Sequence, residues 1–301
     1  MAVIDNDLLS IQEARILAEQ AEEAKRLLAD FSQTRLDTVV GAMCDALREH
    51  MPELARMSLE ETGYGRLEDK LAKDNFVSEN IRRALCGMKC VGFIDENPAM
   101  GLARVGVPLG VVACLTPATS PVSTTVASVL IAVKSGNAII VSPHPRARHT
   151  IWRIMDILHD AALAAGLPPG ALSCCRTLAR DGTRALLNHR DVDMILITGV
   201  PSMLNAARAT GKPLIYGGSG NGPAFIERTA DVAQAAQDII ASKTFDYGVV
   251  SGAEHSVVVD APIEGAARDA FLRNGAYFMN EAEAEALGRC LVQPNGEINP
   301  E

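Results

Sequence analysis

The stretch of the chain that could do covalent chemistry is residues 243–259, KTFDYGVVSGAEHSVVV. Ser251 lies there in a small-residue loop between two glycines, which allow the backbone to turn tightly. A serine hydroxyl becomes a good nucleophile only when a general base lies within hydrogen-bonding reach, and His255 is the nearest candidate base in the sequence. A structural alternative is also open, because Ser251 and Glu254 have the spacing of a capping box on a short helical turn.

Four other loops could bind a ligand: the Gly-rich run 217–223 permits close backbone approach, and the loops that open a helix could hold an anion such as a phosphate. Each follows a short apolar run typical of a buried strand, and a helix that starts after such a loop offers free backbone amides. Hydroxyl-rich loops can equally be ordinary helix caps. The loops are Thr116-Pro117-Ala118-Thr119-Ser120-Pro121, Ser142-Pro143-His144-Pro145-Arg146, Thr198-Gly199-Val200-Pro201-Ser202 and Gly217-Gly218-Ser219-Gly220-Asn221-Gly222-Pro223. No G-x-G-x-x-G fingerprint lies between a strand and a helix, so the residues alone indicate a nucleotide-binding sheet without naming the nucleotide.

The elements that must position these loops alternate between strand and helix from residue 105 onward, which predicts a parallel α/β sheet. We expect strands at residues 111–115, 137–141, 171–175, 193–197 and 213–216. We expect helices at residues 122–134, 150–165, 183–188 and 203–210. A helix at 233–241 and a strand at 256–259 would flank Ser251.

The first third of the sequence predicts a helical layer. Apolar residues recur at three- and four-residue steps over residues 8–60, and a further helix is expected at 69–87. A turn-rich segment at 95–101 would lead into the sheet. No chemically suggestive group of side chains accompanies these helices, so we expect them to be structural.

Composition excludes several classes of function. The chain of 301 residues has 28 Lys and Arg against 37 Asp and Glu, a net charge of −9 without a dense basic run, which argues against nucleic-acid binding. No apolar run reaches the roughly 18 residues of a membrane span, and the N-terminus lacks a signal-peptide pattern, so we expect a cytoplasmic protein. Seven cysteines at irregular spacing fit core thiols better than disulfides or a zinc site.

The motifs together resemble the CoA-acylating branch of the aldehyde dehydrogenase superfamily, including the aldehyde dehydrogenase half of bifunctional acetaldehyde/alcohol dehydrogenases and the acylating sulfoacetaldehyde or succinate semialdehyde dehydrogenases. Those enzymes have Lys-Thr-Phe-Asp-Asn-Gly, two apolar residues and then the catalytic cysteine. In this chain Tyr247 replaces the asparagine, and Ser251 stands at the position of the cysteine. Residues 142–146 also match the Ser-Pro-His-Pro-Arg of the acylating family, and residues 211–213 match its Gly-Lys-Pro segment.

The resemblance implies a fold. We expect an aldehyde-dehydrogenase-like parallel-sheet nucleotide-binding domain with an N-terminal helical layer over residues 1–242. The start of a second α/β catalytic domain would follow over residues 243–301. Family members continue well beyond this point, so the chain resembles a truncated form.

The resemblance also implies site residues. The catalytic position would be Ser251, with Thr119 and its neighbour Ser120 at the position of the side-chain donor to the oxyanion and the backbone N–H of Ser251 as the second donor. In hydrolytic members a glutamate stands where this chain has Gly217, so thiolysis by CoA is favoured over hydrolysis. The residues expected to bind the cofactor are Thr116, Pro117, Ser142, Pro143, His144, Pro145, Thr198, Gly199, Gly217 and Gly218; no metal site is expected.

The implied reaction converts a small aldehyde, NAD and coenzyme A into an acyl-CoA and NADH, in a protein that forms a homo-oligomer at full length. NAD is favoured over NADP, because no acidic or basic residue is evident in the sequence to read the 2′ position of the ribose. Ser251 disfavours the first step, because a thiol is partly ionised near neutrality and a serine hydroxyl is not. We therefore expect an inactivated or truncated enzyme. Two alternatives stay open: a non-catalytic NAD- or CoA-binding module, and a serine-based acyl transferase or hydrolase.

Overall fold

The computed structural model describes residues 5–218 and 220–292, and the chain divides into two compact units. Unit 1 comprises Met1–Thr62 and Lys70–Gly218, and unit 2 comprises Gly63–Asp69 and Ser219–Glu301. This division falls earlier than the expected boundary between residues 242 and 243. The reason is that helix α8 (Val232–Thr244) packs on strands β8 and β9 and on helix α9 of unit 2.

Unit 1 is built on a five-stranded sheet with the order β5-β4-β3-β6-β7, in which all neighbouring strands are parallel. Every residue of β3 and β4 is buried, as expected for strands covered on both faces. The sequence prediction of a parallel sheet with these five strands is confirmed, with ends that differ by at most one residue. The strands are β3 (Val111–Leu115), β4 (Ala138–Ser142), β5 (Leu172–Cys174), β6 (Met194–Thr198) and β7 (Leu214–Gly217).

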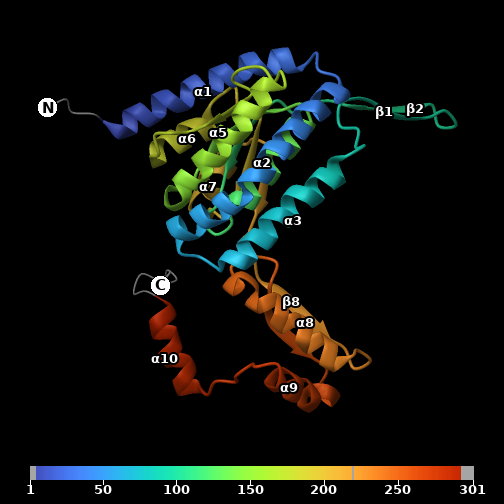
Figure 1. The fold of residues 1–301 in the computed structure, drawn as a ribbon, viewed down its shortest axis with the longest axis vertical. Helices are drawn as coiled ribbons and strands as arrows, with labels where there is room; N and C mark the ends of the chain where they lie inside the picture. Colours follow the sequence, from blue (N-terminus) through green and yellow to red (C-terminus); the bar gives the residue numbers. More distant parts are fainter. Residues whose placement is uncertain (1–4, 219, 293–301) are drawn as a thin grey trace. The chain divides into compact units, whose positions relative to one another are not determined.

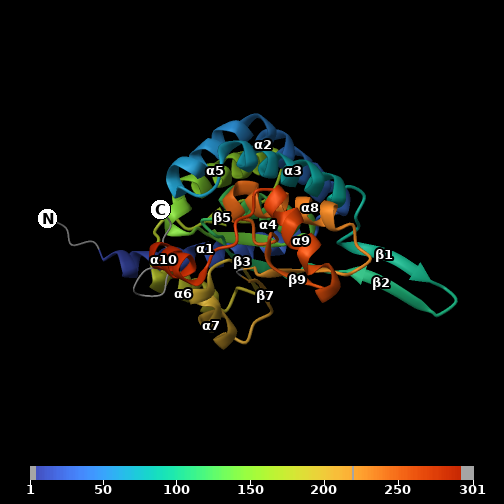
Figure 2. The same ribbon diagram turned by 90° about the horizontal axis from the view of Figure 1, so that it is seen from below.

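Helices cover both faces of this sheet (Figures 1 and 2). Helix α2 (Gln33–Thr62) packs on α4 (Pro121–Lys134) and α5 (Arg148–Ala164), and these three form one layer. Helices α1 (Asn6–Leu28), α6 (Arg180–Asn188) and α7 (Pro201–Ala209) form the other layer, with α6 in contact with both neighbours. Buried alanines at four- and three-residue steps along α1 allow its close approach to the sheet. The expected N-terminal helical layer is confirmed, and α3 (Leu67–Leu85) completes it.

A two-stranded antiparallel hairpin precedes the sheet, formed by β1 (Gly92–Asn97) and β2 (Leu102–Gly106). The turn-rich segment expected at 95–101 is therefore wrong for its first three residues, which belong to β1. Nearly all residues of the two strands are exposed, so no alternation of apolar and polar residues marks them in the sequence.

Unit 2 contains a pair of parallel strands, β8 (Gly222–Ile226) and β9 (Glu254–Val259), with helices α8, α9 (Glu264–Arg273) and α10 (Glu281–Leu291). Its core is small and centres on Ile226, Ala236, Ala270 and Phe271. Strand β8 begins inside the glycine-rich run, where the sequence predicts only a loop.

Three general properties follow from the described residues. None of the helices there is long and apolar enough to cross a membrane. The seven cysteines form no disulfide in the part of the chain that the structure covers. Within the same residues, no group of three or more His, Cys, Asp and Glu side chains could hold a metal ion.

Candidate functional site

Three of the hydroxyl-rich loops meet at one edge of the sheet in unit 1. Because β3, β4 and β6 are parallel neighbours, their carboxyl ends lie at the same edge, which is where parallel α/β sheets bind ligands. Leu115 at the end of β3 is the register partner of Ser142 on one side and of Ile197 on the other. The N–H of Thr116 also donates a hydrogen bond to the carbonyl of Ser142 at 3.4 Å.

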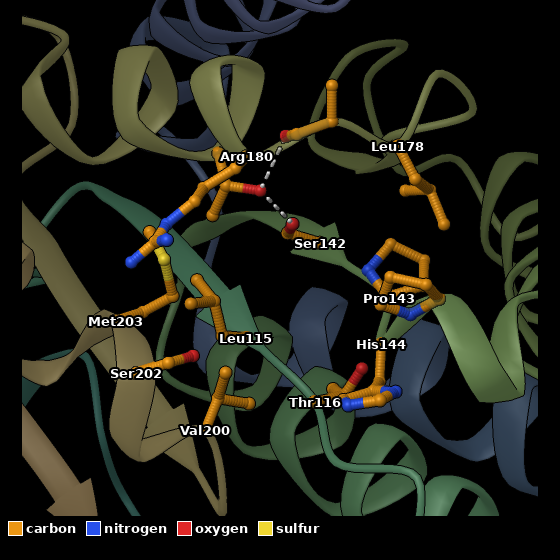
Figure 3. Close-up of a pocket in the computed structure, with 13 residues that line it drawn as sticks. Leu115, Thr116, Ser142, Pro143, His144, Leu178, Arg180, Val200, Ser202 and Met203 are labelled. Atoms are coloured by element: carbon orange, nitrogen blue, oxygen red, sulfur yellow. Dashed lines mark hydrogen bonds between the residues drawn. The ribbon is translucent and has the colours of Figure 1, made fainter. Parts of the chain in front are cut away.

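A cavity of about 300 Å³ opens at this edge (Figure 3). Its walls are largely apolar, with a few hydroxyls and two basic side chains, and no carboxylate lines it. Such a composition is typical of a small-molecule or cofactor site. The lining residues are Leu115, Thr116, Ser142, Pro143, His144, Pro145, Leu178, Ala179, Arg180, Thr183, Val200, Ser202 and Met203.

Five of the predicted cofactor residues line this cavity: Thr116, Ser142, Pro143, His144 and Pro145. The hydroxyl oxygen of Thr116 is buried and has no hydrogen-bond partner among the described residues. A buried polar atom without a partner costs free energy, so a ligand that supplies one would be favoured. The cavity therefore fits a polar molecule of nucleotide type.

The other predicted cofactor residues lie beside the cavity and do not line it. Thr198 and Gly217 are register partners at the ends of β6 and β7, and Gly218 follows directly. The N–H of Gly199 donates to the carbonyl of Gly217 at 3.2 Å. A Cβ atom on Gly199 would lie 3.1 Å from Cβ of Pro117, and Gly199 has a φ of 66°, so glycine allows this close approach.

The ring of His144 lines the cavity in a defined protonation state. Its Nδ1 accepts a hydrogen bond from the backbone N–H of Arg146 at 3.1 Å. Burial, and to a lesser degree the charge of Arg146, lowers the pKa of His144. The ring is therefore neutral at pH 7, and its proton lies on Nε2, which is left as a hydrogen-bond donor.

A hydroxyl pair spans the cavity wall between β4 and α6 (Figure 3). The hydroxyl of Thr183 donates to the carbonyl of Ala179 at 3.3 Å, and its oxygen lies 3.4 Å from Oγ of Ser142. Because the proton of Thr183 is already used, Ser142 is the donor in the second contact.

Arg180 is a lining residue that the sequence did not identify, whereas Ser202 belongs to the loop 198–202 that was expected to hold an anion. The helix after β5 is expected from residue 183 but begins at Arg180, and this places the arginine at the carboxyl edge of the sheet. The order of the strands, which the sequence does not reveal, brings this edge position next to the loops after β3 and β4. A basic residue a few positions after a predicted strand is the signal that could have identified it.

Thr119 and Ser120, the predicted oxyanion donors, are half-buried residues of unit 1 at the start of α4. Ser120 is the N-cap residue, but its side chain makes no capping hydrogen bond. Its hydroxyl instead accepts a hydrogen bond from Nζ of Lys73 at 3.1 Å. The hydroxyl of Ser120 is therefore not used as an ordinary helix cap.

Ser251 lies in unit 2, in an exposed turn just before β9. The capping-box expectation is wrong, because Glu254 is the first residue of β9 and leaves no helix to be capped. The backbone N–H of Ser251 has no hydrogen-bond partner within the described parts of the chain. A Cβ atom on Gly220, which has a φ of 77°, would lie 2.2 Å from the carbonyl oxygen of Ser251, so the glycine-rich run approaches this turn closely.

His255 does not form a catalytic pair with Ser251 in this structure. Its Nδ1 lies 2.7 Å from the carbonyl of Ala253. Among the described residues, no hydrogen bond joins the ring to the hydroxyl of Ser251. The nearest candidate for a general base to a serine nucleophile is therefore not in place.

The turn that leads to Ser251 has an unusual backbone. Asp246, Tyr247 and Gly248 have φ angles of 51°, 54° and 73°, so three consecutive residues adopt the left-handed conformation. This conformation costs non-glycine residues roughly 1 kcal/mol or more each. Tyr247, which is 72% exposed, gains little packing to offset that cost.

Asp246 holds this turn in place. It is completely buried, and its Oδ1 accepts a hydrogen bond from the backbone N–H of Arg66 at 2.9 Å. The N–H of Asp246 donates to Oδ2 of Asp69 at 2.9 Å, and the guanidinium of Arg66 makes two hydrogen bonds to the same carboxylate. A Cβ atom on Gly65 would lie 1.9 Å from Oδ1 of Asp246, so only glycine fits there.

The model of the family described as "Aldehyde dehydrogenase family" matches residues 7–276. The chain belongs to the aldehyde dehydrogenase family. Among curated relatives of this aldehyde dehydrogenase chain is the bifunctional aldehyde-alcohol dehydrogenase AdhE of Escherichia coli, which is 36% identical over 96% of the chain. That alignment covers 32% of AdhE, so the chain spans about a third of that relative.

Solved structures agree with this family membership. An acetylating aldehyde dehydrogenase from Geobacillus thermoglucosidasius is 38% identical, with a TM-score of 0.91 over 99% of this aldehyde dehydrogenase chain and 66% of the other. A propionaldehyde dehydrogenase from Rhodopseudomonas palustris, solved with bound CoA and an acylated cysteine, is 27% identical. Its TM-score is 0.81 over 95% of this chain and 65% of the other. The α/β fold with a parallel sheet is thus shared with acylating members of the family.

Proposed function

We propose that this chain is the nucleotide-binding part, with the nucleophile loop, of a CoA-acylating aldehyde dehydrogenase in which Ser251 occupies the position of the catalytic cysteine. The family reaction would convert a small aldehyde, CoA and NAD or NADP into an acyl-CoA and the reduced cofactor. The observation that carries the proposal is the cavity where residues 142–145 meet Thr116 at the carboxyl edge of the sheet. The chain would contribute cofactor binding and have low or no turnover.

The relatives support the acylating branch. The names of two of them include "acetylating" or describe bound CoA with an acylated cysteine. A further solved relative, an engineered glycolyl-CoA reductase with bound NADP⁺, is 27% identical to this chain. For the present chain, NAD or NADP would be the cofactor and CoA the second substrate. A cytoplasmic homo-oligomer is part of the same proposal.

The cavity residues would hold the adenosine end of the cofactor. Thr116 offers a buried hydroxyl without a partner, and His144 offers a neutral ring with a proton on Nε2. The predicted residues beside the cavity, from Thr198 to Gly218, would stabilise its floor through the pairing of β6 and β7. The bound cofactor would supply the hydride acceptor of the reaction.

The oxyanion of the reacting carbonyl would be held by two donors. The backbone N–H of Ser251 is available, because it makes no hydrogen bond to the described residues. Thr119, or Ser120 beside it, would supply the side-chain donor. Loss of one such donor typically reduces the rate by about 10²-fold or more.

The chemical weakness of the site is the hydroxyl at position 251. Serine needs a base, and His255 is engaged with the carbonyl of Ala253. Gly217 likewise offers no side chain that could activate water, so hydrolysis is disfavoured. A serine-based hydrolase is for these reasons the weaker alternative, and a pure NAD- or CoA-binding module is the stronger one.

Covalent labelling tests this proposal. The chain, the variant Ser251→Cys and the control Ser251→Ala would be incubated with acetyl-CoA and analysed by peptide mass spectrometry. We expect an acetyl group on residue 251 only in Ser251→Cys, because only a thiol is nucleophilic enough without a base. An acetyl ester on Ser251 in the unaltered chain would refute the proposal and support serine chemistry.

A further inference from the structure

The cavity at the carboxyl edge of the sheet contains a positive charge that the sequence alone did not place there. Its lining includes Arg180 and no aspartate or glutamate. In dinucleotide sites a carboxylate commonly accepts a hydrogen bond from the free 2′-hydroxyl of the NAD ribose, whereas an arginine accommodates the 2′-phosphate of NADP. An arginine without a nearby carboxylate in the lining therefore fits a ribose that carries a phosphate.

The guanidinium of Arg180 is not neutralised by a neighbour. Within the described residues, no carboxylate lies within ion-pair distance of it. The arginines on either side in sequence differ in this respect: Arg176 pairs with Asp156, and Arg184 lies 3.7 Å from Asp181. An exposed, uncompensated arginine at the rim of a cavity is well suited to form a bidentate contact with a phosphate.

The position of Arg180 fits this role (Figure 3). Its side chain extends beside Met203, and Pro143 and His144 lie on the opposite wall. Ser202 lies on the wall that includes Met203 and could add a hydroxyl donor. The N-cap residue of α6 is Ala179, whose methyl side chain cannot accept a hydrogen bond from the first amides of the helix.

We propose that Arg180 recognises a phosphomonoester on the ribose of a bound adenosine nucleotide, so that this chain distinguishes NADP or CoA from their dephosphorylated counterparts. The inference rests on the proposed function, because it specifies which group of the ligand is recognised at the same cavity. Two ligands of the family reaction carry such a group: NADP on the ribose 2′ position and CoA on the 3′ position. The shared chemistry is a dianionic phosphate next to the adenosine.

Binding measurements on the unaltered chain test the inference without any need for turnover. Isothermal titration calorimetry would compare 5′-AMP with adenosine 2′,5′-bisphosphate and adenosine 3′,5′-bisphosphate, and then NAD with NADP and dephospho-CoA with CoA. We expect at least one bisphosphate to bind about tenfold or more tightly than 5′-AMP, the gain typical of a charge-assisted hydrogen bond. Preference for the 2′ isomer would identify NADP, and preference for the 3′ isomer would identify CoA.

The variants Arg180→Leu and Arg180→Lys separate recognition from folding. We expect Arg180→Leu to remove the preference, so that neither bisphosphate binds more tightly than 5′-AMP, and Arg180→Lys to retain part of the preference. Arg184→Leu, on the next turn of α6 and outside the cavity lining, is the matched control and should keep the full preference.

Equal affinity of the unaltered chain for 5′-AMP and both bisphosphates, or a preference that survives in Arg180→Leu, would overturn the inference and leave the proposed function intact. Failure of every adenosine nucleotide to bind would instead contradict the cofactor site itself. The two failures are therefore distinguishable in one experiment.

Discussion

The backbone N–H of Arg66 donates a hydrogen bond to Oδ1 of Asp246 at 2.9 Å, although the two residues are 180 positions apart in the chain. The contact joins the segment before α3 to the turn that leads to Ser251, and both segments belong to unit 2. The buried carboxylate therefore fixes a left-handed turn whose backbone would otherwise be unfavourable.

Replacement of Asp246 should destabilise this turn. In Asp246→Ala the N–H of Arg66 loses its acceptor, and the loss of this partly buried hydrogen bond costs about 1–3 kcal/mol. We expect a lower free energy of unfolding of that size in urea titrations, together with faster proteolysis within residues 243–253. The exposed Asp238→Ala on α8 is the control and should have little effect. Equal stability of the Asp246 variant and the unaltered chain would contradict the role assigned to the carboxylate.

Replacement of Tyr247 should have the opposite effect. Tyr247 has a φ of 54° and is 72% exposed, so it carries conformational strain with little packing. Tyr247→Asn or Tyr247→Gly should raise the free energy of unfolding by about 0.5–1 kcal/mol, because both residues adopt the left-handed region more readily. Thermal or urea unfolding measures the change. A loss of stability in both variants would show that the tyrosine makes stabilising contacts in the folded chain.

The cysteines should divide sharply in reactivity. Burial raises the pKa of Cys114 and of Cys175 to about 12, and it raises that of Cys174 well above its usual value. With iodoacetamide at pH 7.5 these three thiols should stay unmodified, whereas the exposed Cys86 and Cys290 react. Peptide mass spectrometry before and after unfolding gives the result. Rapid modification of Cys114 in the folded chain would contradict the buried sheet.

The phosphate preference proposed for Arg180 should depend on pH. A phosphomonoester loses its second proton with a pKa of about 6, so the ligand gains negative charge between pH 5.5 and 7.5. The titratable groups that line the cavity are Arg180, which stays charged, and His144, whose pKa is lowered chiefly by burial. The ratio of the affinities for adenosine 2′,5′-bisphosphate and 5′-AMP should therefore rise with pH. A ratio that falls would indicate recognition by a protonated histidine instead.

Much of the fold could be predicted from the sequence because burial leaves a clear pattern. Strands such as β3 and β4 are covered on both faces and appear as continuous apolar runs between turn residues. Strands β1, β2 and β8 were not predicted, because the first two are exposed and the third starts within glycines. The pattern of apolar residues cannot predict strands that form only through pairing with a strand elsewhere in the chain.

The same limit applies to the site. The hydroxyl-rich loops after β3 and β4 were predicted as ligand loops, and five of their residues line the cavity. Arg180 was not assigned, because its place at the cavity depends on the strand order and on where α6 begins. Glu254 matched a capping box in spacing, but pairing with β8 places it in a strand. Here pairing between distant strands, and not the local spacing of Ser251 and Glu254, determines the structure.

The most direct test of the proposed function is CoA-dependent formation of NADH or NADPH from short aldehydes. The chain would be fused to the part of the acetylating Geobacillus enzyme that its match does not cover and assayed with Ser251 or with Ser251→Cys, beside the Geobacillus enzyme as the positive control. We predict turnover with the cysteine and little or none with the serine. Turnover with Ser251 equal to that of the variant, or no turnover in either while the control is active, would contradict an acylating dehydrogenase disabled at position 251.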